Sequence, residues 1–378
     1  MQKKLDFRFH LTREPVIIAV LSVGAMLCFA AVSGLSGMYH GREQSLGVEW
    51  FNRGSEDLKA GRYAPAVEEF RTALLYSRDN YIYQLSLAEA LKGLGRTDAA
   101  SAYFMNLWDR EPENGVVNLE LARIAANGGQ PNQALRYYHN AIYATWPDEA
   151  TASRREARLE LIHYLLTIHN RAQARSELIA LEANLDDPAV QTQVGALFLQ
   201  AQDYADALNA FRQGLKASKK NPAALAGAGK AAFQLTQYRT AAQYLRSAAT
   251  LDSGDKDLAS LLETSELVLN MNPFQHDIPA GERYQIVMKA FAAAGDRLKS
   301  CPALSTAPAP ATATQNLSDD WAKMKPQMTE RGLRRDPDLV ENSMDLVFEI
   351  ERQAAAACGT PTPMDNALLL IAHLHEGN

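Results

Sequence analysis

The sequence has few cysteines and no excess of positive charge, and each of these features excludes a class of function. Three cysteines occur in 378 residues, and no two have the Cys-x-x-Cys spacing that zinc, iron or thioredoxin-like sites need. The net charge of −6 argues against nucleic-acid binding, which requires a basic surface. The motifs of metalloproteases, serine hydrolases and nucleotide-binding loops are also missing. We therefore expect no enzyme activity, no cofactor, no metal site and no small-molecule substrate.

One long apolar run is present near the N-terminus. Residues 16–35 carry no charge over a length that matches the roughly 30 Å hydrocarbon core of a bilayer. Basic residues precede it, which predicts a cytoplasmic segment 1–15, a transmembrane anchor over 16–38, and all later residues outside the cytoplasm. In a bacterium this places the chain in the inner membrane with its main part in the periplasm. The alternative is a cleaved signal peptide ending near Ala31-Val32-Ser33.

Beyond the apolar run, small and aromatic residues recur at a step of 34 residues. Gly61, Gly95 and Gly129 are the clearest series, and Ala66, Ala100, Ala134 and Phe70, Phe104, Tyr138 follow the same step. This pattern resembles the tetratricopeptide repeat (TPR), a pair of helices of that length that stacks into a superhelix. The fold class that we expect is therefore all-α, a TPR superhelix.

The resemblance divides most of the chain into six repeats. In the first three, a small residue is expected where helix A crosses helix B, an aromatic residue fills the hollow beside the crossing, and a left-handed glycine ends helix A. The later repeats match less well, and the fourth has His169-Asn170 where the turn glycine would be. A longer connection near residues 148–154 interrupts the period, and residues 256–272 are expected to form a capping helix. The six units are 47–80, 81–114, 115–148, 155–187, 188–221 and 222–255.

In TPR proteins, side chains of helix A line a concave groove that takes an extended peptide or a partner helix. The carboxylate-binding version of the groove is not matched, because Phe51, Ser55, Ser86 and Glu120 occupy its positions and only Arg123 is basic. An alternative is that Phe51, Leu85 and Leu119 only pack helix A against its neighbours. The positions that the resemblance places in the groove are Phe51, Ser55, Leu85, Glu89, Leu119, Arg123, His163, Lys230 and Phe233.

The repeat is lost in the C-terminal region, residues 273–378. Apolar spacing predicts helices over 280–300, 337–357 and 363–374, with a Pro/Ala/Thr-rich linker at 302–318. A further helix over 319–332 is less certain because Pro326 lies in its middle. If the main helices alternate in direction, Cys301 and Cys358 meet, and an oxidising compartment would join them in a disulfide. The alternative is two unpaired thiols.

These features favour a membrane-anchored scaffold or adaptor that binds proteins at the periplasmic face of the inner membrane. Two other functions fit the same sequence. One is a periplasmic chaperone-like factor that binds unfolded or nascent chains, and the other is a non-catalytic subunit of an envelope enzyme or biogenesis complex.

Overall fold

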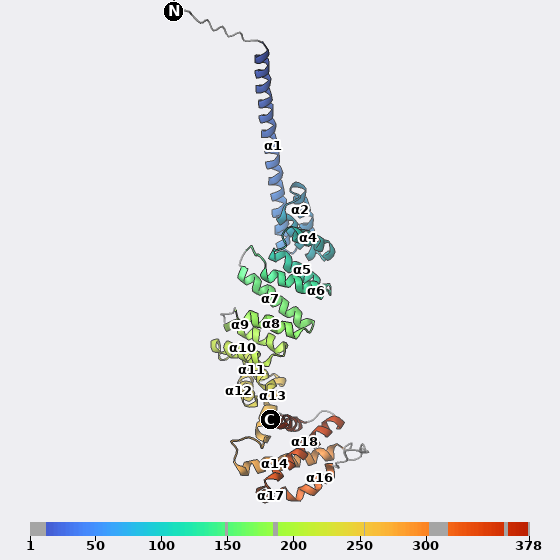
Figure 1. Cartoon of the computed structure of the whole chain (residues 1–378), viewed down its shortest axis with the longest axis vertical. Coiled ribbons are helices and arrows are strands. Elements are labelled where there is room, and N and C mark those ends of the chain that lie inside the picture. Colours follow the sequence, from blue (N-terminus) through green and yellow to red (C-terminus); the bar gives the residue numbers. More distant parts are fainter. Residues whose placement is uncertain are drawn as a thin grey trace, which may run out of the picture. The chain divides into compact units, whose positions relative to one another are not determined.

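The chain is described by a computed structural model over residues 13–147, 150–183, 188–252, 254–301, 317–358 and 362–376. It divides into two units, Met1–Tyr164 and Leu165–Asn378 (Figure 1). The described residues are helical apart from turns and short loops, and their isolated parallel β-bridge joins Asn114 to Thr145. The protein is therefore all-α, as the sequence predicts.

The first unit begins with one very long helix, α1, Arg13–Lys59. Its N-terminal part is apolar and lies away from the other helices of the unit (Figure 1). Its C-terminal part packs against α2 as helix A of the first repeat. The anchor and the first repeat, which the sequence divides at residue 38, are thus one unbroken helix. The other helices that begin in this unit are α2 Tyr63–Tyr76, α3 Tyr81–Gly93, α4 Thr97–Arg110, α5 Gly115–Asn127, α6 Pro131–Tyr143 and α7 Ala150–Thr167.

The second unit continues the helix pairs and then changes architecture. Repeat helices are followed by α13, at the position expected for the capping helix, and α13 packs against the last helix, α19. The helices are α8 Arg171–Glu182, α9 Pro188–Gln200, α10 Tyr204–Ala217, α11 Pro222–Gln234, α12 Tyr238–Ala249, α13 Lys256–Met271, α14 Ala280–Ser300, α16 Leu317–Met324, η1 Lys325–Gln327, α17 Glu330–Arg335, α18 Asp338–Cys358 and α19 Pro363–Glu376.

Six turns between helix A and helix B share one backbone geometry. In each, one residue takes a positive φ, and the next N–H donates to the carbonyl five residues earlier, as Arg96 does to Leu91 at 2.9 Å. Glycine occupies the first three of these positions. The turn residues are Gly61, Gly95, Gly129, His169, Gln202 and Thr236.

Helix A crosses helix B closely because the crossing residue is small. A Cβ added to Gly54 would lie 2.8 Å from the ring of Phe70, and one added to Gly195 would lie 2.9 Å from Phe211. These two crossings are therefore filled by the same division of volume, a glycine on helix A and a phenylalanine ring on helix B.

The C-terminal helices form one core with the end of the repeats. Tyr238 of α12 and Val268 of α13 belong to the same buried cluster as Phe348 of α18. Trp321 fixes α16 on α14, because its indole stacks on Phe291 at 5.3 Å and its Nε1 donates to the Phe291 carbonyl at 3.0 Å. The helix expected over 319–332 is instead three pieces, α16, η1 and α17. Pro326 lies in η1, where it cannot donate an intrahelical hydrogen bond.

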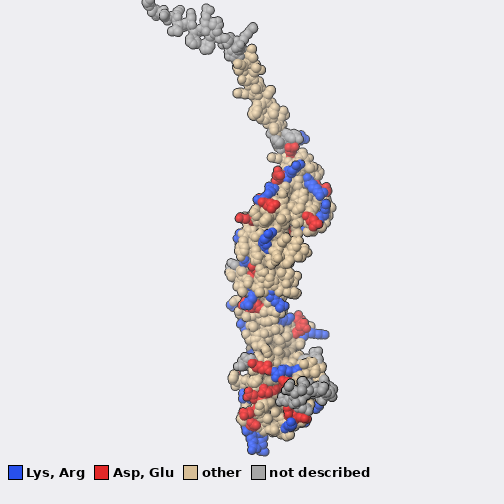
Figure 2. Space-filling view, turned by 45° about the vertical axis from the view of Figure 1, so that its right-hand side comes forward, with Lys and Arg blue, Asp and Glu red and all other residues tan. Residues whose placement is uncertain are grey.

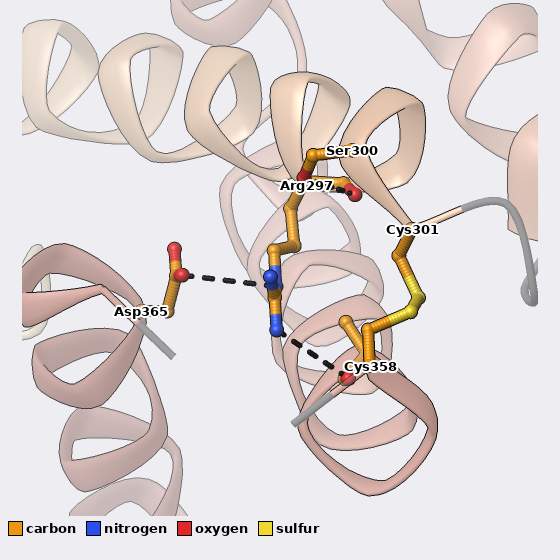
Figure 3. Close-up of a disulfide and its surroundings, with 6 residues drawn as sticks. Arg297, Ser300, Cys301, Cys358 and Asp365 are labelled. Atoms are coloured by element: carbon orange, nitrogen blue, oxygen red, sulfur yellow. Dashed lines mark hydrogen bonds and ion pairs between the residues drawn. A yellow bond between two sulfur atoms is a disulfide. The ribbon is translucent and has the colours of Figure 1, made fainter. Parts of the chain in front are cut away.

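A disulfide joins the ends of α14 and α18 (Figure 3). Cys301 and Cys358 are 57 residues apart in sequence, with Cα atoms 5.8 Å apart. Beside the disulfide, Arg297 lies 3.7 Å from the carboxylate of Asp365 and donates to the Ala354 carbonyl at 3.4 Å. Three helices, α14, α18 and α19, are thereby linked at this end of the region.

Candidate binding groove

Three helices of the first unit present a row of charged side chains that links one repeat to the next. On α3, Leu85, Glu89 and Lys92 lie on one helix face because they are four and three residues apart. The helices α5 and α7 carry Glu120, Arg123, Glu156 and Glu160, of which Arg123 is at the repeat position of Glu89.

The charged groups bond across the helices. Lys92 Nζ of α3 lies 2.5 Å from Glu120 Oε2 of α5, and Arg123 donates to the other Glu120 oxygen at 2.6 Å. Arg123 Nε also donates to Glu160 Oε2 of α7 at 2.9 Å, and Glu156 lies 4.0 Å from the same guanidinium. Lys92 and Arg123 therefore connect the A helices of three consecutive repeats.

Burial strengthens this network. The Glu120 side chain is 8% exposed and its two oxygens accept from two different cations. The hydrogen bond to Glu160 is the main reason that the pKa of Arg123 lies above its usual value. Burial and then the charge of Glu160 raise the pKa of Tyr138, which lies beside the pair, to about 12. Arg123 therefore stays charged and Tyr138 stays neutral at neutral pH.

Glu89 is in a different environment. Burial, followed by the charge of Glu120, raises the pKa of this carboxyl, and Lys92 lowers it less. Lys92 is hydrogen-bonded to Glu120 instead. Among the described residues, the Glu89 carboxylate makes no hydrogen bond or ion pair. It is thus a half-buried acceptor in the row with no cation of its own.

Several predicted groove residues pack inside the protein instead. Leu119 is only 6% exposed, so its prediction as a partner-binding residue is wrong. Phe51 is half-buried, stacks on Tyr83 at 4.8 Å and lies 5.7 Å from Phe70, which is the packing role left open by the sequence. Phe233 packs in the same way, against Tyr238 at 5.4 Å. Large apolar residues on helix A fill the space between neighbouring helices because that contact buries more apolar surface than the groove does.

The remaining predicted positions are more accessible. Leu85 is half-buried on α3, and His163 is exposed on α7. The Ser55 hydroxyl donates to the Phe51 carbonyl at 2.9 Å, so it serves its own helix. Lys230 is half-buried on α11, in the second unit.

The sequence prediction did not assign Glu156 and Glu160 to the groove. A signal for them existed: Ser86, Glu120 and Glu160 occupy equivalent positions in successive repeats, one residue beyond the row that was chosen. The sequence alone does not show that the side chains of Glu120 and Glu160 point toward Arg123.

The charged side chains of this row can form hydrogen bonds and ion pairs with a partner. Carboxylates can accept from Lys, Arg or backbone N–H groups of a partner. Among the described residues, no three His, Cys, Asp or Glu side chains lie together so as to hold a metal ion.

Comparison with known proteins identifies the repeats. The family model for the tetratricopeptide repeat matches residues 51–111 and 195–256. No curated protein matches the sequence significantly. Among solved structures, the type IV pilus biogenesis factor PilW is 17% identical, with a TM-score of 0.40, over 57% of this chain and 98% of its own. PilF of Pseudomonas aeruginosa is 16% identical, with a TM-score of 0.40, over 57% and 96%. YrrB, described as a TPR protein with an unusual peptide-binding site, is 16% identical, with a TM-score of 0.41, over 51% and 96%.

The chain contains tetratricopeptide repeats, which the family model matches at residues 51–111 and 195–256. It is a protein-interaction scaffold of the α-solenoid class, and one helix of its described part is long and apolar enough to cross a membrane.

Proposed function

We propose that this protein is a single-pass membrane scaffold that displays its TPR units outside the cytoplasm and binds a protein partner in the groove of the first unit. The observation that carries the proposal is helix α1, because it joins an apolar segment directly to the first repeat. The groove supplies the binding surface, and the disulfide favours an oxidising compartment outside the cytoplasm.

The apolar part of α1 has no partner within its unit. Ile17, Leu21, Met26 and Phe29 are each between 56% and 76% exposed. Figure 2 displays this stretch as an uncharged stem, in contrast to the mixed charges of the repeats. About twenty such residues would expose far more apolar surface than a water-soluble protein tolerates, so lipid is the environment that fits them.

The orientation rests on two independent features. Lys3, Lys4, Arg8 and Arg13 precede the apolar segment, which favours a cytoplasmic N-terminus. The disulfide between Cys301 and Cys358 fits an oxidising compartment on the other side. Both features support an extracytoplasmic location of the repeats, which is the periplasm in a bacterium.

Cysteine labelling tests the orientation. The free cysteine among the described residues, Cys28, lies in the apolar segment, so it is replaced by Ser before reporters are added. A Leu75→Cys variant, at an 81% exposed position of α2, is expected to react with a membrane-impermeant maleimide in intact cells. A Lys4→Cys variant should react only after permeabilisation. The reverse pattern would overturn the orientation, and loss of the N-terminal segment from the mature mass would favour a signal peptide.

Site-specific photocrosslinking tests the groove. A photoreactive amino acid is placed at Leu85 on α3 and, as the matched control, at Tyr143 on α6, which is 76% exposed outside the row. One or a few discrete crosslinked proteins at Leu85 and none at Tyr143 are expected. A broad smear of many clients would favour the chaperone-like function, and equal products at both sites would move binding away from the groove.

A further inference from the structure

The charged row of the first unit has more carboxylates than cations. We define it as the groove row: Glu89, Lys92, Glu120, Arg123, Glu156 and Glu160. Its four acidic and two basic side chains give the groove row a net charge of −2. A surface of this sign attracts cations and repels anions before any contact is made.

Both cations of the groove row are already bonded inside the protein. Arg123 contacts Glu120 and Glu160, and Lys92 contacts Glu120. An anionic partner could take Arg123 only by leaving Glu120, which is 8% exposed, with one fewer cation. Removing one member of a buried pair is strongly unfavourable, so these cations are structural and are not available to a ligand.

Two carboxylates of the groove row have unused capacity. Glu89 is half-buried and makes no hydrogen bond or ion pair among the described residues. Glu156 is 68% exposed and its contact is a long one, 4.0 Å to Arg123. Leu85 lies one helical turn before Glu89 on the same face and adds an apolar contact.

We infer that the groove of the first unit selects a partner segment that carries Lys or Arg beside apolar residues. The basic side chains pair with Glu89 and Glu156, and an apolar side chain between them contacts Leu85. This rests on the proposed function, because it names the chemistry of the partner at the same groove. It also predicts selectivity opposite to that of TPR grooves that grip a carboxylate.

Two synthetic peptides with capped ends are the probes. One repeats Lys-Leu-Ala-Ser and the other repeats Glu-Leu-Ala-Ser, so that only the charge differs. Binding is measured by fluorescence anisotropy to the full-length protein in nanodiscs of phosphatidylcholine, and empty nanodiscs report any binding of the peptide to lipid. The Lys peptide is expected to bind, more weakly at high salt because screening reduces the attraction. The Glu peptide is not.

Variants assign the binding to the groove row. The double variant Glu89→Gln/Glu156→Gln should weaken Lys-peptide binding roughly five- to tenfold, because it removes two ion pairs that are each modest in solvent. The matched control Glu68→Gln removes a carboxylate that is 72% exposed on α2, outside the row, and should leave binding unchanged. Circular dichroism melting of each variant verifies that it folds.

The outcomes separate this inference from the proposed function. Equal loss of binding in the double variant and the control, or no binding of the Lys peptide to the wild type, overturns the inference. Preference for the Glu peptide overturns it too. In each of these cases, a discrete protein crosslinked at Leu85 would still support the scaffold function. If no protein is crosslinked there, the inference and the proposed function both fail.

Discussion

At the scale of single residues, the six turns between helices differ in backbone strain. A non-glycine residue in the left-handed region loses roughly 1–2 kcal/mol to contact between its Cβ and the backbone. His169, Gln202 and Thr236 take φ values of 59°, 61° and 57°. Thr236 is the most strained of the three because its side chain is β-branched. The turns of the last three repeats are therefore less stable than those of the first three, in which glycine takes the left-handed conformation.

Replacing Thr236 by glycine is expected to stabilise the second unit by about 1 kcal/mol, since it removes the strain but adds freedom to the unfolded chain. The matched substitution in the opposite direction is Gly95→Ala, at a φ of 79°, which should destabilise the first unit by a similar amount. Urea unfolding of the full-length protein in detergent measures both. A loss of stability in Thr236→Gly would contradict this account.

Glu351 is a second residue in an unfavourable environment, because its carboxyl group is buried without hydrogen bonds among the described residues. It is fully buried on α18, and neither of its carboxylate oxygens has a hydrogen-bond partner among the described residues. Burial, and then Asp365 of α19, raise its pKa to about 7, while Arg297 of α14 acts in the opposite direction. The folded protein therefore holds the proton of Glu351 more tightly than the unfolded chain does.

This predicts stability that depends on pH. Because the folded pKa lies above the unfolded value of 4.5, the contribution is fully present below that value and is lost as pH rises to about 7. Glu351→Gln keeps a neutral side chain and should remove this slope, gaining on the order of 3 kcal/mol at pH 8 relative to the wild type. Denaturation at pH 5 and pH 8 measures it. An equal slope in both proteins would assign the pH dependence to other groups.

At the scale of helices, the crossing pair sets how closely A and B approach. Gly54 leaves room for the ring of Phe70 in the first repeat, and Gly195 leaves room for the ring of Phe211 in the fifth. Volume that is added on one side must be removed from the other, since the interior is close-packed.

Gly54→Ala is therefore expected to destabilise the first unit by about 1–3 kcal/mol, because its Cβ would lie 2.8 Å from the ring of Phe70. Adding Phe70→Leu, which removes the ring that the new Cβ would meet, should return part of that loss. Gly281→Ala is the control, since a Cβ there meets no atom within 4 Å. Thermal unfolding distinguishes the three variants, and additive losses in the double variant would refute the compensation.

The disulfide closes a loop of 57 residues between α14 and α18. By the chain-entropy relation, its removal is expected to lower the stability of the second unit by roughly 4 kcal/mol. Cys358→Ser is compared with the wild type before and after reduction. Reduction should bring the wild type to the variant's midpoint and leave the variant unchanged, whereas an unaffected wild type would mean that the bridge contributes little.

The sequence predicted the helices better than the groove. Spacing alone placed the repeat pairs, because Gly61, Gly95 and Gly129 each end a helix for a local reason. It also indicated that Pro326 would interrupt its helix, which it does. It failed for Leu119, whose burial depends on neighbouring helices, and it missed Glu160, whose role depends on Arg123, which is 37 residues away in sequence. Side-chain direction across helices is tertiary information that no local pattern contains.

At the scale of the whole molecule, α1 is the element that joins the apolar segment to the first repeat. It continues unbroken through residues 39–46, which span about 12 Å between the apolar segment and the first repeat. A break here should uncouple the repeat from the anchor without unfolding either.

Ser45→Pro tests this coupling, because proline interrupts an interior helix at a cost of about 3 kcal/mol. A fluorophore at Leu75→Cys reports its distance from labelled lipid headgroups in bilayers of different thickness. In the otherwise wild-type chain the distance should change with thickness, since the anchor tilts to match the hydrocarbon core. With Ser45→Pro the change should vanish while unfolding of the repeats is unaltered. Identical behaviour of the two proteins would show that α1 is not a stiff connection.

A stiff α1 acts as a lever arm. A tilt of about 20°, usual for a membrane helix, moves the end of an arm of twenty residues sideways by roughly 10 Å. The groove row of the first unit would swing with it. The position of the groove row relative to a partner anchored in the same bilayer would then depend on lipid thickness. The lipid composition would thereby influence binding.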